Sequence, residues 1–487
     1  MSNSFTYHPR PTDSKSEVIN GETSGRASSF RDPSGFIFEK EKILYRQVNK
    51  SFKEHFDFFI SSGFYEKLVQ QQLLIPHETI NENLTGSSEW YATLKPERIE
   101  FISYPWEWSF DMLKDAALLT LRLAKEAVAS GMVLKDATPY NIQWHKAGLN
   151  DSVGQGRLIF IDSLSFEKYD PEEPWIAYRQ FCENFLAPLL LMHYSKNSLQ
   201  QIMLAYPEGI PLAVAKSLLP WRSKFSLHTY LHIHLHASVA KRKSAASASK
   251  QKFSKQKFLN LISSLEILIS RLRSAEQSTT WSAYYEEASQ RNDYLEQKKK
   301  IIVQWLETMP AIKTAADLGA NDGEFSRLLS SKKIQSIAAD FDPYCINKLY
   351  NQLKAGQGKN IQPLIVDLSN PSPAIGVNNE ERSSFISRLH VELALALALV
   401  HHLAIGKNIP LEMIADLFQR ICSTLIIEFV PKEDEKLQLM LANKKDIYPG
   451  YTAENFEKAF GKYFRLVKKE AIASSGRTLY LMTRHEG

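Results

Sequence analysis

The chain has 487 residues, of which 44% are hydrophobic and 23% are charged, and its formal net charge is +5. This length allows two or three domains, and the composition is that of an ordinary globular protein. A net charge this small for the length argues against nucleic acid as a partner. The three cysteines form no CxxC pair, so we expect neither a disulfide scaffold nor a structural zinc site.

The ends and the middle of the chain indicate how it is divided. Residues 1–30 are rich in Ser, Thr, Asn and Pro and predict a flexible tail without the apolar core of a signal peptide. No run of about 18 apolar residues occurs, so we expect a cytoplasmic protein without a membrane span. We interpret 239–300 as a basic linker and connecting helices between an N-terminal domain (31–238) and a C-terminal domain (301–487). The sequence leaves the oligomeric state open.

The linker contains an unusually basic stretch. Residues 241–257 carry seven basic residues and no acidic ones. A solvated linker is our interpretation. Contact with nucleic acid or another anionic surface is the alternative.

The N-terminal domain begins with a pattern typical of a β-hairpin, GFIFEKEKILYRQV, which includes Arg46. FISYPWEW (101–108) predicts a strand that enters a hinge, and 111–131 has the periodicity of a helix. The motif D-x-x-x-x-N then places Asp136 five residues before Asn141, and a further strand ends at Asp162.

This order of elements resembles the kinase-like fold, an α+β architecture. In phosphotransferases of that kind the first aspartate receives the substrate proton, while the asparagine and the later aspartate hold Mg²⁺ on ATP. By this resemblance Asp136, Asn141 and Asp162 are candidate nucleotide and magnesium residues, and Arg46 lies near the place of a phosphate-binding lysine.

The sequence departs from the kinase pattern at several points. No histidine precedes Asp136, Asp162 is followed by Ser163 and Leu164, and no glycine-rich phosphate loop is evident before residue 45. Three interpretations stay open: active phosphotransfer with ATP, a degenerate kinase-like fold kept for binding, and an unrelated α+β domain in which the polar residues cap a turn.

A histidine cluster follows in HTYLHIHLHA. On a strand His232, His234 and His236 would share one face, whereas on a helix His228 and His232 would align. No nearby Cys, Asp or Glu completes a metal-binding set, so we predict packed or surface histidines and no metal site.

In the C-terminal domain predicted strands alternate with helices. The predicted strands are 313–319, 335–340, 362–368, 392–400, 424–430, 465–472 and 477–484. Predicted helices separate the first six of them, at 324–333, 343–356, 381–389, 410–422 and 453–464. This alternation predicts an α/β, Rossmann-like parallel sheet with helices on both faces, and the last two strands predict an antiparallel hairpin at its edge.

The first strand leads into TAADLGANDGEFS (314–326), in which a helix is expected to start at Asp322. No lysine follows Gly323, which excludes a P-loop. A dinucleotide fold prefers GxGxxG, but here the glycines are spaced GxxxG and Asp322 stands where a pyrophosphate would disfavour negative charge. A ligand without phosphates, such as S-adenosylmethionine (SAM), suits the loop better.

Two further acids stand at strand ends. Asp340 ends the second strand, where a carboxylate can take both ribose hydroxyls, and Asp367 ends the third, near the expected adenine amino group. The alternative is that these acids only cap helices or turns.

The segments DLGANDG, AADFDP and IVDLSNP resemble those of class I SAM-dependent methyltransferases, over roughly 300–487. More narrowly, the chain resembles bacterial methyltransferases of the NoeA-like, nodulation protein-like family. The resemblance implies that the methionine part of the cofactor is held by Asp317, Gly319, Asn321 and Gly323. It also implies that Asp340 holds the ribose and that Asp367 holds the adenine.

Candidate catalytic residues follow the fourth and fifth predicted strands. His401 and His402 are candidate general bases near neutral pH, and Glu428 and Asn408 occupy similar rims. Glu392 lies at the opposite edge and is expected to be structural.

The function expected from this pattern is methyl transfer to a small-molecule or carbohydrate-type acceptor, which the N-terminal domain recognises. The alternatives are a phosphotransferase or bifunctional enzyme that uses ATP and Mg²⁺, and a non-catalytic binding module.

Overall fold

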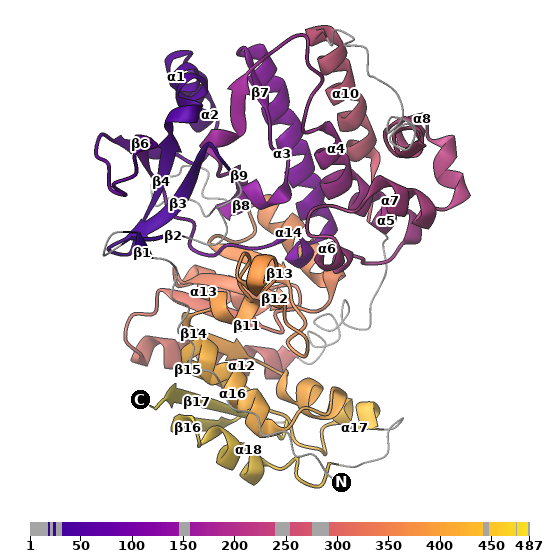
Figure 1. Cartoon of the computed structure of the whole chain (residues 1–487). Helices are drawn as coiled ribbons and strands as arrows, with labels where there is room; N and C mark the ends of the chain where they lie inside the picture. The colour runs from indigo at the N-terminus through magenta and orange to yellow at the C-terminus, as the bar shows by residue number, and fades with distance from the viewer. Residues whose placement is uncertain are drawn as a thin grey trace, which may run out of the picture.

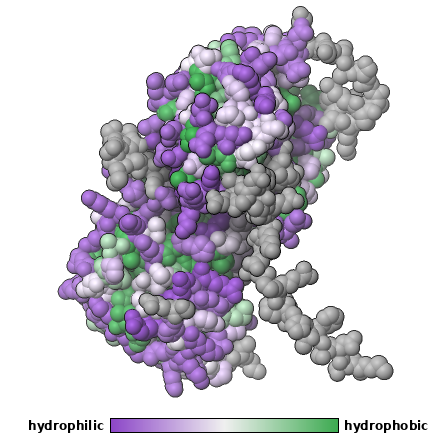
Figure 2. Space-filling model, turned by 60° about the vertical axis from the view of Figure 1, so that its left-hand side comes forward, coloured by the Kyte–Doolittle hydropathy of each residue, from purple (hydrophilic) through white to green (hydrophobic). Residues whose placement is uncertain are grey.

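The structure is a computed structural model that describes residues 18–19, 23–25, 32–145, 156–238, 254–274, 292–441, 448–473 and 475–485. Most of the predicted tail and of the basic stretch 241–257 lies outside these residues. The chain folds into two bodies, with the N-terminal half above the C-terminal half in Figure 1. The face shown in Figure 2 is mainly hydrophilic, with smaller hydrophobic areas on both bodies.

The N-terminal half contains a six-stranded sheet with the order β1-β2-β3-β4-β6-β5. Its strands are β1 (Val18–Ile19), β2 (Thr23–Gly25), β3 (Gly35–Lys40), β4 (Ile43–Asn49), β5 (His77–Ile80) and β6 (Trp90–Pro96). The predicted hairpin is confirmed, because β3 pairs antiparallel with β4. Its two-residue turn is built from Glu41 and Lys42, which take positive φ values of 52° and 65°.

The prediction of a strand at FISYPWEW (101–108) is wrong. Strand β6 ends before it, and within the segment lies only the short 3₁₀-helix η3 (Pro105–Glu107). Proline has no backbone N–H to give to a sheet. The amide of Ser103 donates instead to Oε1 of Gln143, at 2.9 Å, so a side chain replaces the sheet partner.

Helices make up most of the rest of this half. They are η2 (Lys50–Phe52), α1 (Lys53–Ser61), α2 (Phe64–Gln70), α3 (Phe110–Ala129), η4 (Pro139–Asn141), η5 (Ser163–Ser165), α4 (Tyr178–Phe181), η6 (Cys182–Leu186), α5 (Ala187–Ser195), α6 (Ile202–Ala205), α7 (Leu212–Leu218), η7 (Trp221–Phe225), α8 (Leu227–Thr229), η8 (Tyr230–Leu235) and α10 (Lys255–Arg271). Two small antiparallel pairs join β7 (Met132–Leu134) to β10 (Phe166–Lys168) and β8 (Ile142–His145) to β9 (Arg157–Phe160). The predicted helix at 111–131 is confirmed as α3, which Ser109 caps by accepting from the amide of Met112.

The C-terminal half is built on a seven-stranded sheet with the order β13-β12-β11-β14-β15-β17-β16. Its strands are β11 (Thr314–Leu318), β12 (Gln335–Asp340), β13 (Ile361–Ile365), β14 (Val391–Ala396), β15 (Cys422–Phe429), β16 (Phe464–Ala471) and β17 (Thr478–Arg484). The first five are parallel, and the last two form the predicted antiparallel hairpin at the edge. This is the strand order of the class I methyltransferase fold, as predicted.

Helices cover this sheet. They are α12 (Asn292–Thr308), α13 (Glu324–Ser331), α14 (Pro343–Lys354), η10 (Val377–Asn379), α15 (Phe385–Arg388), η11 (His402–Gly406), α16 (Leu411–Ile421), α17 (Glu435–Leu441) and α18 (Ala453–Phe460). The fourth strand ends at Ala396 rather than at the predicted Val400, because Ala398 takes a positive φ of 51° that breaks the extended backbone. The loop helix starts at Glu324 rather than at Asp322.

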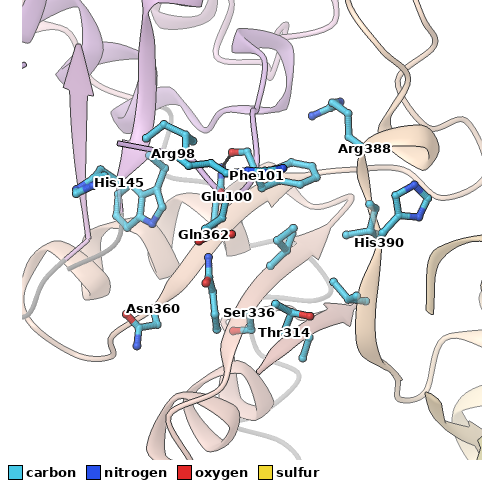
Figure 3. Close-up of a pocket in the computed structure, with 17 residues that line it drawn as sticks. Arg98, Glu100, Phe101, His145, Thr314, Ser336, Asn360, Gln362, Arg388 and His390 are labelled. Atoms are coloured by element: carbon cyan, nitrogen blue, oxygen red, sulfur yellow. Dashed lines mark hydrogen bonds between the residues drawn. The ribbon is translucent and has the colours of Figure 1, made fainter. Parts of the chain in front are cut away.

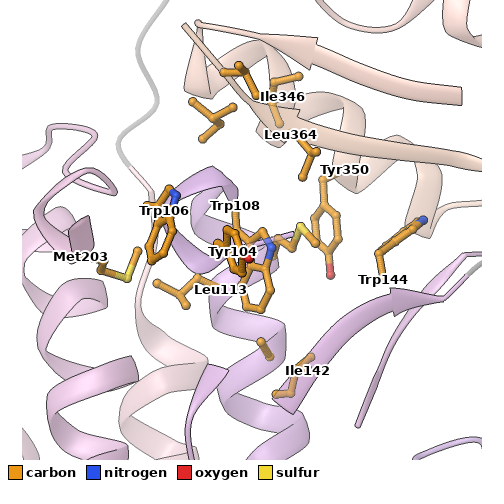
Figure 4. Close-up of a cluster of buried hydrophobic side chains, with 14 of the residues drawn as sticks. Tyr104, Trp106, Trp108, Leu113, Ile142, Trp144, Met203, Ile346, Tyr350 and Leu364 are labelled. Atoms are coloured by element: carbon orange, nitrogen blue, oxygen red, sulfur yellow. The ribbon is translucent and has the colours of Figure 1, made fainter. Parts of the chain in front are cut away.

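The two halves share one hydrophobic core (Figure 4). Trp144 of β8 packs on Tyr350 of α14 with ring centroids 5.9 Å apart. An ion pair between Glu107 and Arg388, both almost fully buried, also crosses the interface. The N-terminal half therefore lies against α14 and the amino ends of the C-terminal strands.

Candidate functional site

A cavity of about 210 Å³ opens at the carboxyl ends of the parallel strands of the C-terminal half. In open α/β sheets ligands bind at this edge. The residues that line it come from α12, from the loops after β11, β12, β13 and β14, and from η11. They are Tyr294, Leu295, Lys298, Gly319, Asn321, Asp340, Phe341, Val366, Asp367, Leu368, Leu397, Ala398, Leu399, His402, Leu403, Gly406 and Lys407.

The loop after β11 forms one wall of the cavity. Gly319 and Asn321 both take left-handed backbone conformations, with φ values of 82° and 52°. Asparagine tolerates this region better than other side chains do, so Asn321 stands where a second glycine would otherwise be needed. The amide of Gly319 donates to the carbonyl of Ala339 at 2.8 Å, which fixes the loop to the end of β12.

Asp340 is the residue that joins this loop to the next one. Its two carboxylate oxygens accept from the backbone amides of Asn321 and Asp342, each at 2.8 Å. Burial raises the pKa of Asp340 to about 6, although these amide hydrogen bonds favour the charged form. The carboxylate therefore lies at the cavity wall in a fixed orientation.

Asp367 and Phe341 form the neighbouring part of the cavity. Asp367 accepts from the amide of Ser369 at 2.8 Å, and Lys407 lies 3.7 Å from its other oxygen. Phe341 is 55% exposed, which is unusual for a large apolar residue beside a polar loop. An exposed aromatic residue that lines the same cavity as two carboxylates suits a flat, partly polar ligand.

Two of the predicted cofactor residues do not line the cavity. Asp317 is buried beneath the loop, where it accepts from the hydroxyl of Ser326 at 2.7 Å, and burial raises its pKa to about 6. Gly323 faces α14, and a Cβ atom there would come within 2.6 Å of Leu349. Both residues therefore shape the loop from behind.

The two predicted histidines take different positions. His402 lines the cavity, whereas His401 is buried behind it, and their ring centroids are 4.0 Å apart. Burial and the charge of Arg477 lower the pKa of His402 to about 4, and burial lowers the pKa of His401 well below its ordinary value. Both imidazoles are therefore neutral at pH 7, and His402 is a weaker base than we predicted from the sequence.

Glu428 lies inside β15 and not on the rim that we predicted for it. Its fully buried carboxylate pairs with Lys298 at 2.6 Å and with Arg477 at 3.4 Å. Burial by itself raises the pKa of Glu428, but the two cations outweigh that effect and hold the pKa below its ordinary value. Glu428 therefore positions Lys298 and Tyr294, which reach the cavity wall.

Sequence reasoning missed Tyr294 and Lys298. They are four residues apart on α12, so they lie on the same face of that helix. The signal was present as a tyrosine and a lysine at helical spacing, but nothing in the sequence showed that α12 closes the cavity.

The other two residues weighed from the sequence, Asn408 and Glu392, do not line the cavity. The side chain of Asn408 forms a hydrogen bond with the hydroxyl of Tyr448. Glu392 accepts from the amide of Thr314, at the opposite edge of the sheet, which confirms the structural role expected for it.

A larger cleft of about 640 Å³ lies mainly in the N-terminal half, and residues 380–388 of the C-terminal half close one side of it. Apolar residues of β3, β4 and β6 line it, together with Arg46 and Asn141. The structure brings the three predicted polar residues together: Asn141 donates to Asp136 at 3.0 Å and to the hydroxyl of Ser165 at 3.4 Å, and that hydroxyl donates to Asp162. Asp162 also accepts from Arg46 at 2.7 Å.

The carboxylate of Asp162 is already fully engaged. Besides Arg46, it accepts from the amide of Leu164 and the hydroxyl of Ser165, both at 2.8 Å. The oxygen donors suit Mg²⁺ in kind, but a metal ion would have to displace the guanidinium of Arg46. Among the described residues no group of three His, Cys, Asp or Glu side chains could hold a metal.

The predicted histidine cluster is helical. His228 and His232 both lie 2.8 Å from the hydroxyl of Ser264, and His234 lies 2.8 Å from that of Ser223. These contacts are those of packed histidines.

A third hollow, of about 120 Å³, lies between the two halves (Figure 3). Arg98, Phe101 and His145 line it from the N-terminal half, and Thr314 and Gln362 from the C-terminal half. It shares Arg98 and Phe101 with the large cleft. This hollow lies at the amino ends of the C-terminal strands, and the large cleft adjoins it. The large cleft and the C-terminal cavity are therefore at opposite ends of the sheet.

Several solved methyltransferase structures are similar to part of the chain. The N-methyltransferase NodS of Bradyrhizobium japonicum WM9 is 13% identical, with a TM-score of 0.30, and the match covers 40% of this chain and 98% of that one. Magnesium protoporphyrin IX methyltransferase of Synechocystis PCC 6803 is 14% identical over 43% of this chain and 89% of its own, with a TM-score of 0.30. The bifunctional kinase-methyltransferase WbdD is 18% identical over 45% of this chain and 46% of its own, with a TM-score of 0.29. The fold assignment rests on the strand order and not on these scores.

The match to a curated protein is much more extensive. No family model matches the chain. The nodulation protein NoeA of Rhizobium meliloti strain 1021 is 32% identical to it over 476 residues, and the match covers 94% of this chain and 96% of that protein. A match of this extent includes both halves, so the chain belongs to the NoeA family and carries a class I methyltransferase fold in its C-terminal half.

Proposed function

We propose that the protein is a SAM-dependent methyltransferase whose cofactor binds in the C-terminal cavity. The observation that carries the proposal is the position of Asp340, whose carboxylate ties the loop of Gly319 and Asn321 to the next strand and faces the cavity. A carboxylate in that place accepts hydrogen bonds from hydroxyl groups and repels a pyrophosphate.

The chemistry of the wall fits the proposed cofactor. Asp340 and Asp367 offer acceptors for ribose hydroxyls and an amino group, and the exposed ring of Phe341 offers a flat apolar surface in the same cavity. Lys298, held by Glu428, supplies a cation on the α12 side, where a carboxylate of the ligand can bind. When bound, SAM would supply a methyl group on a sulfonium centre.

His402 is the residue that we assign to the acceptor. Its neutral imidazole lines the cavity and can accept a proton from a hydroxyl or amine of the acceptor. Its lowered pKa makes it a weak base, so we assign it mainly to orienting the acceptor. Leu399 and Leu403 flank it and keep water from that side of the cavity.

We infer a small-molecule acceptor, with a carbohydrate-type metabolite as one class to test. The N-terminal cleft lies at the far end of the sheet, which gives no support to direct presentation of the acceptor by the N-terminal half. That half therefore binds a separate ligand or partner in this proposal.

Titration calorimetry with SAM and with S-adenosylhomocysteine tests the cofactor assignment. We expect each to bind at one site and to compete with the other. NADH serves as the control for a dinucleotide, and it should not bind. Binding of NADH in place of SAM would overturn the proposal.

A second candidate function is nucleotide-dependent phosphotransfer in the N-terminal half. The observation that favours it is the grouping of Asp136, Asn141 and Asp162 beside the large cleft. Burial and the charge of Asp162 raise the pKa of Asp136, which suits a group that accepts a proton. Because the guanidinium of Arg46 already pairs with the carboxylate of Asp162, this candidate function ranks second. A thermal shift with Mg-ATP but none with SAM would reverse the order.

A further inference from the structure

The N-terminal half carries an unusual concentration of exposed apolar side chains from the end of α7 through η7, α8 and η8. Figure 1 shows α8 at the outer margin of that half, away from the C-terminal sheet. Among the described residues, those of this segment that are large, apolar and more than a third exposed are Leu218, Trp221, Phe225, Leu227, Tyr230, Leu231 and Leu235. We call this set the apolar face.

The apolar face is ordered and lies along one side of a helix. Leu227, Leu231 and Leu235 follow one another at intervals of four residues and are 66%, 41% and 41% exposed. Thr229 and Ile233, on the other side of the same helix, are fully buried. The exposure therefore follows from the helical pattern.

Two aromatic residues extend the apolar face. Trp221 and Phe225 are 71% and 77% exposed, and their rings pack edge to face with centroids 5.2 Å apart. Exposed patches that contain Trp and Phe mark contact surfaces, because water solvates such rings poorly.

The charge of this part of the chain is also unusual. Residues 209–265 contain no Asp or Glu but ten Lys and Arg, so the remainder of the chain has a net charge of −5. The small overall charge hides this asymmetry. Arg222 and Lys224 stand between the exposed aromatic rings, so positive charge and apolar surface occupy the same segment.

We propose that the apolar face docks on an anionic lipid bilayer. A helix with Trp, Phe and Leu on one face and basic residues around it binds at the level of the lipid headgroups. Each basic residue near the surface adds attraction to anionic lipid. No helix in the described part of the chain is long and apolar enough to span a bilayer, so the contact is interfacial. The described residues 209–238 carry Lys216, Arg222 and Lys224 but no Asp or Glu, which distinguishes this surface from one built for a basic partner.

Flotation with lipid vesicles tests the proposal on the full chain. We expect the protein to float with vesicles of phosphatidylcholine mixed with phosphatidylglycerol and not with phosphatidylcholine alone. Added salt should release it, because it screens the charge attraction. Fluorescence of Trp221 should shift to the blue on binding, and a Trp221→Phe variant identifies that signal.

The double variant Trp221→Ser/Phe225→Ser removes the two most exposed rings. Its partitioning into the anionic vesicles should fall at least about tenfold, since each ring loses the gain from apolar burial. The matched control is Met413→Ser, which alters a side chain 64% exposed on α16 and should bind as the unaltered chain does. Circular dichroism confirms that the variants are folded.

Four outcomes would overturn the proposal. They are no binding to anionic vesicles at low salt, equal binding to both kinds of vesicle, binding unchanged in the double variant, and a concentration-dependent dimer that the double variant abolishes while vesicles do not bind. The last would assign the apolar face to a second copy of the chain. None of these outcomes depends on methyl transfer.

Discussion

Buried carboxylates lie at the wall of the C-terminal cavity and, paired with a lining residue, beside the N-terminal cleft, but they are satisfied in different ways. Asp340 accepts from backbone amides on its two neighbouring loops. Asp162 accepts from the guanidinium of Arg46, and so it is neutralised by the chain itself. Amides fix a carboxylate without cancelling its charge, so the cavity is ready for a ligand with hydroxyl groups or a cation. The cleft must first give up an ion pair.

The largest expected effect concerns the wall of the cavity. Glu428→Gln would leave Lys298 buried without its anion, while Arg477 would keep its ion pair with Asp434 at 2.7 Å. Breaking such a pair from one side costs about 3–5 kcal/mol, and we expect the free energy of unfolding to fall by about that amount. Chemical denaturation measures it.

The control is Glu412→Gln, which alters an exposed pair with Lys462 and should leave the free energy of unfolding nearly unchanged. An equally small effect of Glu428→Gln would show that the buried network does not support the cavity.

Asp340→Asn and Asp162→Asn test the comparison directly. Asn keeps the size of the side chain but loses the charge that ribose hydroxyls and a sulfonium favour. Two charge-assisted contacts are lost, so we expect SAM affinity to fall about 100-fold in Asp340→Asn and to stay unchanged in Asp162→Asn. Calorimetry on both variants gives the result. A loss of SAM affinity in Asp162→Asn alone would show that SAM binds at the N-terminal cleft and not in the C-terminal cavity.

Arg46→Met tests the ion pair in the cleft. Asp162 would lose its cation but keep its hydrogen bonds to Leu164 and Ser165. We therefore expect a loss of about 2 kcal/mol, less than for a fully isolated buried charge. Thermal unfolding measures the change. Arg98→Met, which lines the same cleft and donates to the carbonyl of Lys42, is the control and should cost less. Equal losses of stability in the two variants would show that the ion pair between Arg46 and Asp162 does not stabilise the fold.

The smallest effect is a dependence on pH. Burial raises the pKa of Asp340 to about 6, so the native state holds a proton that the unfolded chain releases between its ordinary pKa and that value. This group contributes stability below its ordinary pKa that is lost as the pH rises through about 6. SAM favours the ionised carboxylate, so its affinity should rise about tenfold between about pH 5 and about pH 7.

In the Asp340→Asn variant the free energy of unfolding and the SAM affinity should depend less on pH. A residual dependence should come from Asp317, whose pKa is also about 6. A flat profile for the unaltered chain would contradict the role given to Asp340.

Much of the C-terminal fold could be predicted from the sequence because its strands are short apolar runs between amphipathic helices. Gly319, Asn321, Asp340 and Asp367 could be placed at the cavity because the carboxyl ends of parallel strands share one edge. The position of Glu428 could not, since whether a residue faces solvent depends on α12, far away in the chain.

The N-terminal half was harder to predict. The strand expected at 101–108 fails because Gln143, which supplies the competing hydrogen bond, is distant in sequence.

In the C-terminal half the fourth strand was predicted to be too long for a similar reason. Leu397 and Leu399 line the cavity, which periodicity alone does not reveal.

Photo-crosslinking of labelled SAM, followed by peptide mapping, tests the central claim most directly, because it asks which of the two regions takes the adenosyl ligand. We predict label in peptides that contain 319–321, 340–341 or 366–368, and competition by S-adenosylhomocysteine. Label in peptides of the cleft, around 35–49 or 136–145, with none at the C-terminal cavity, would contradict it.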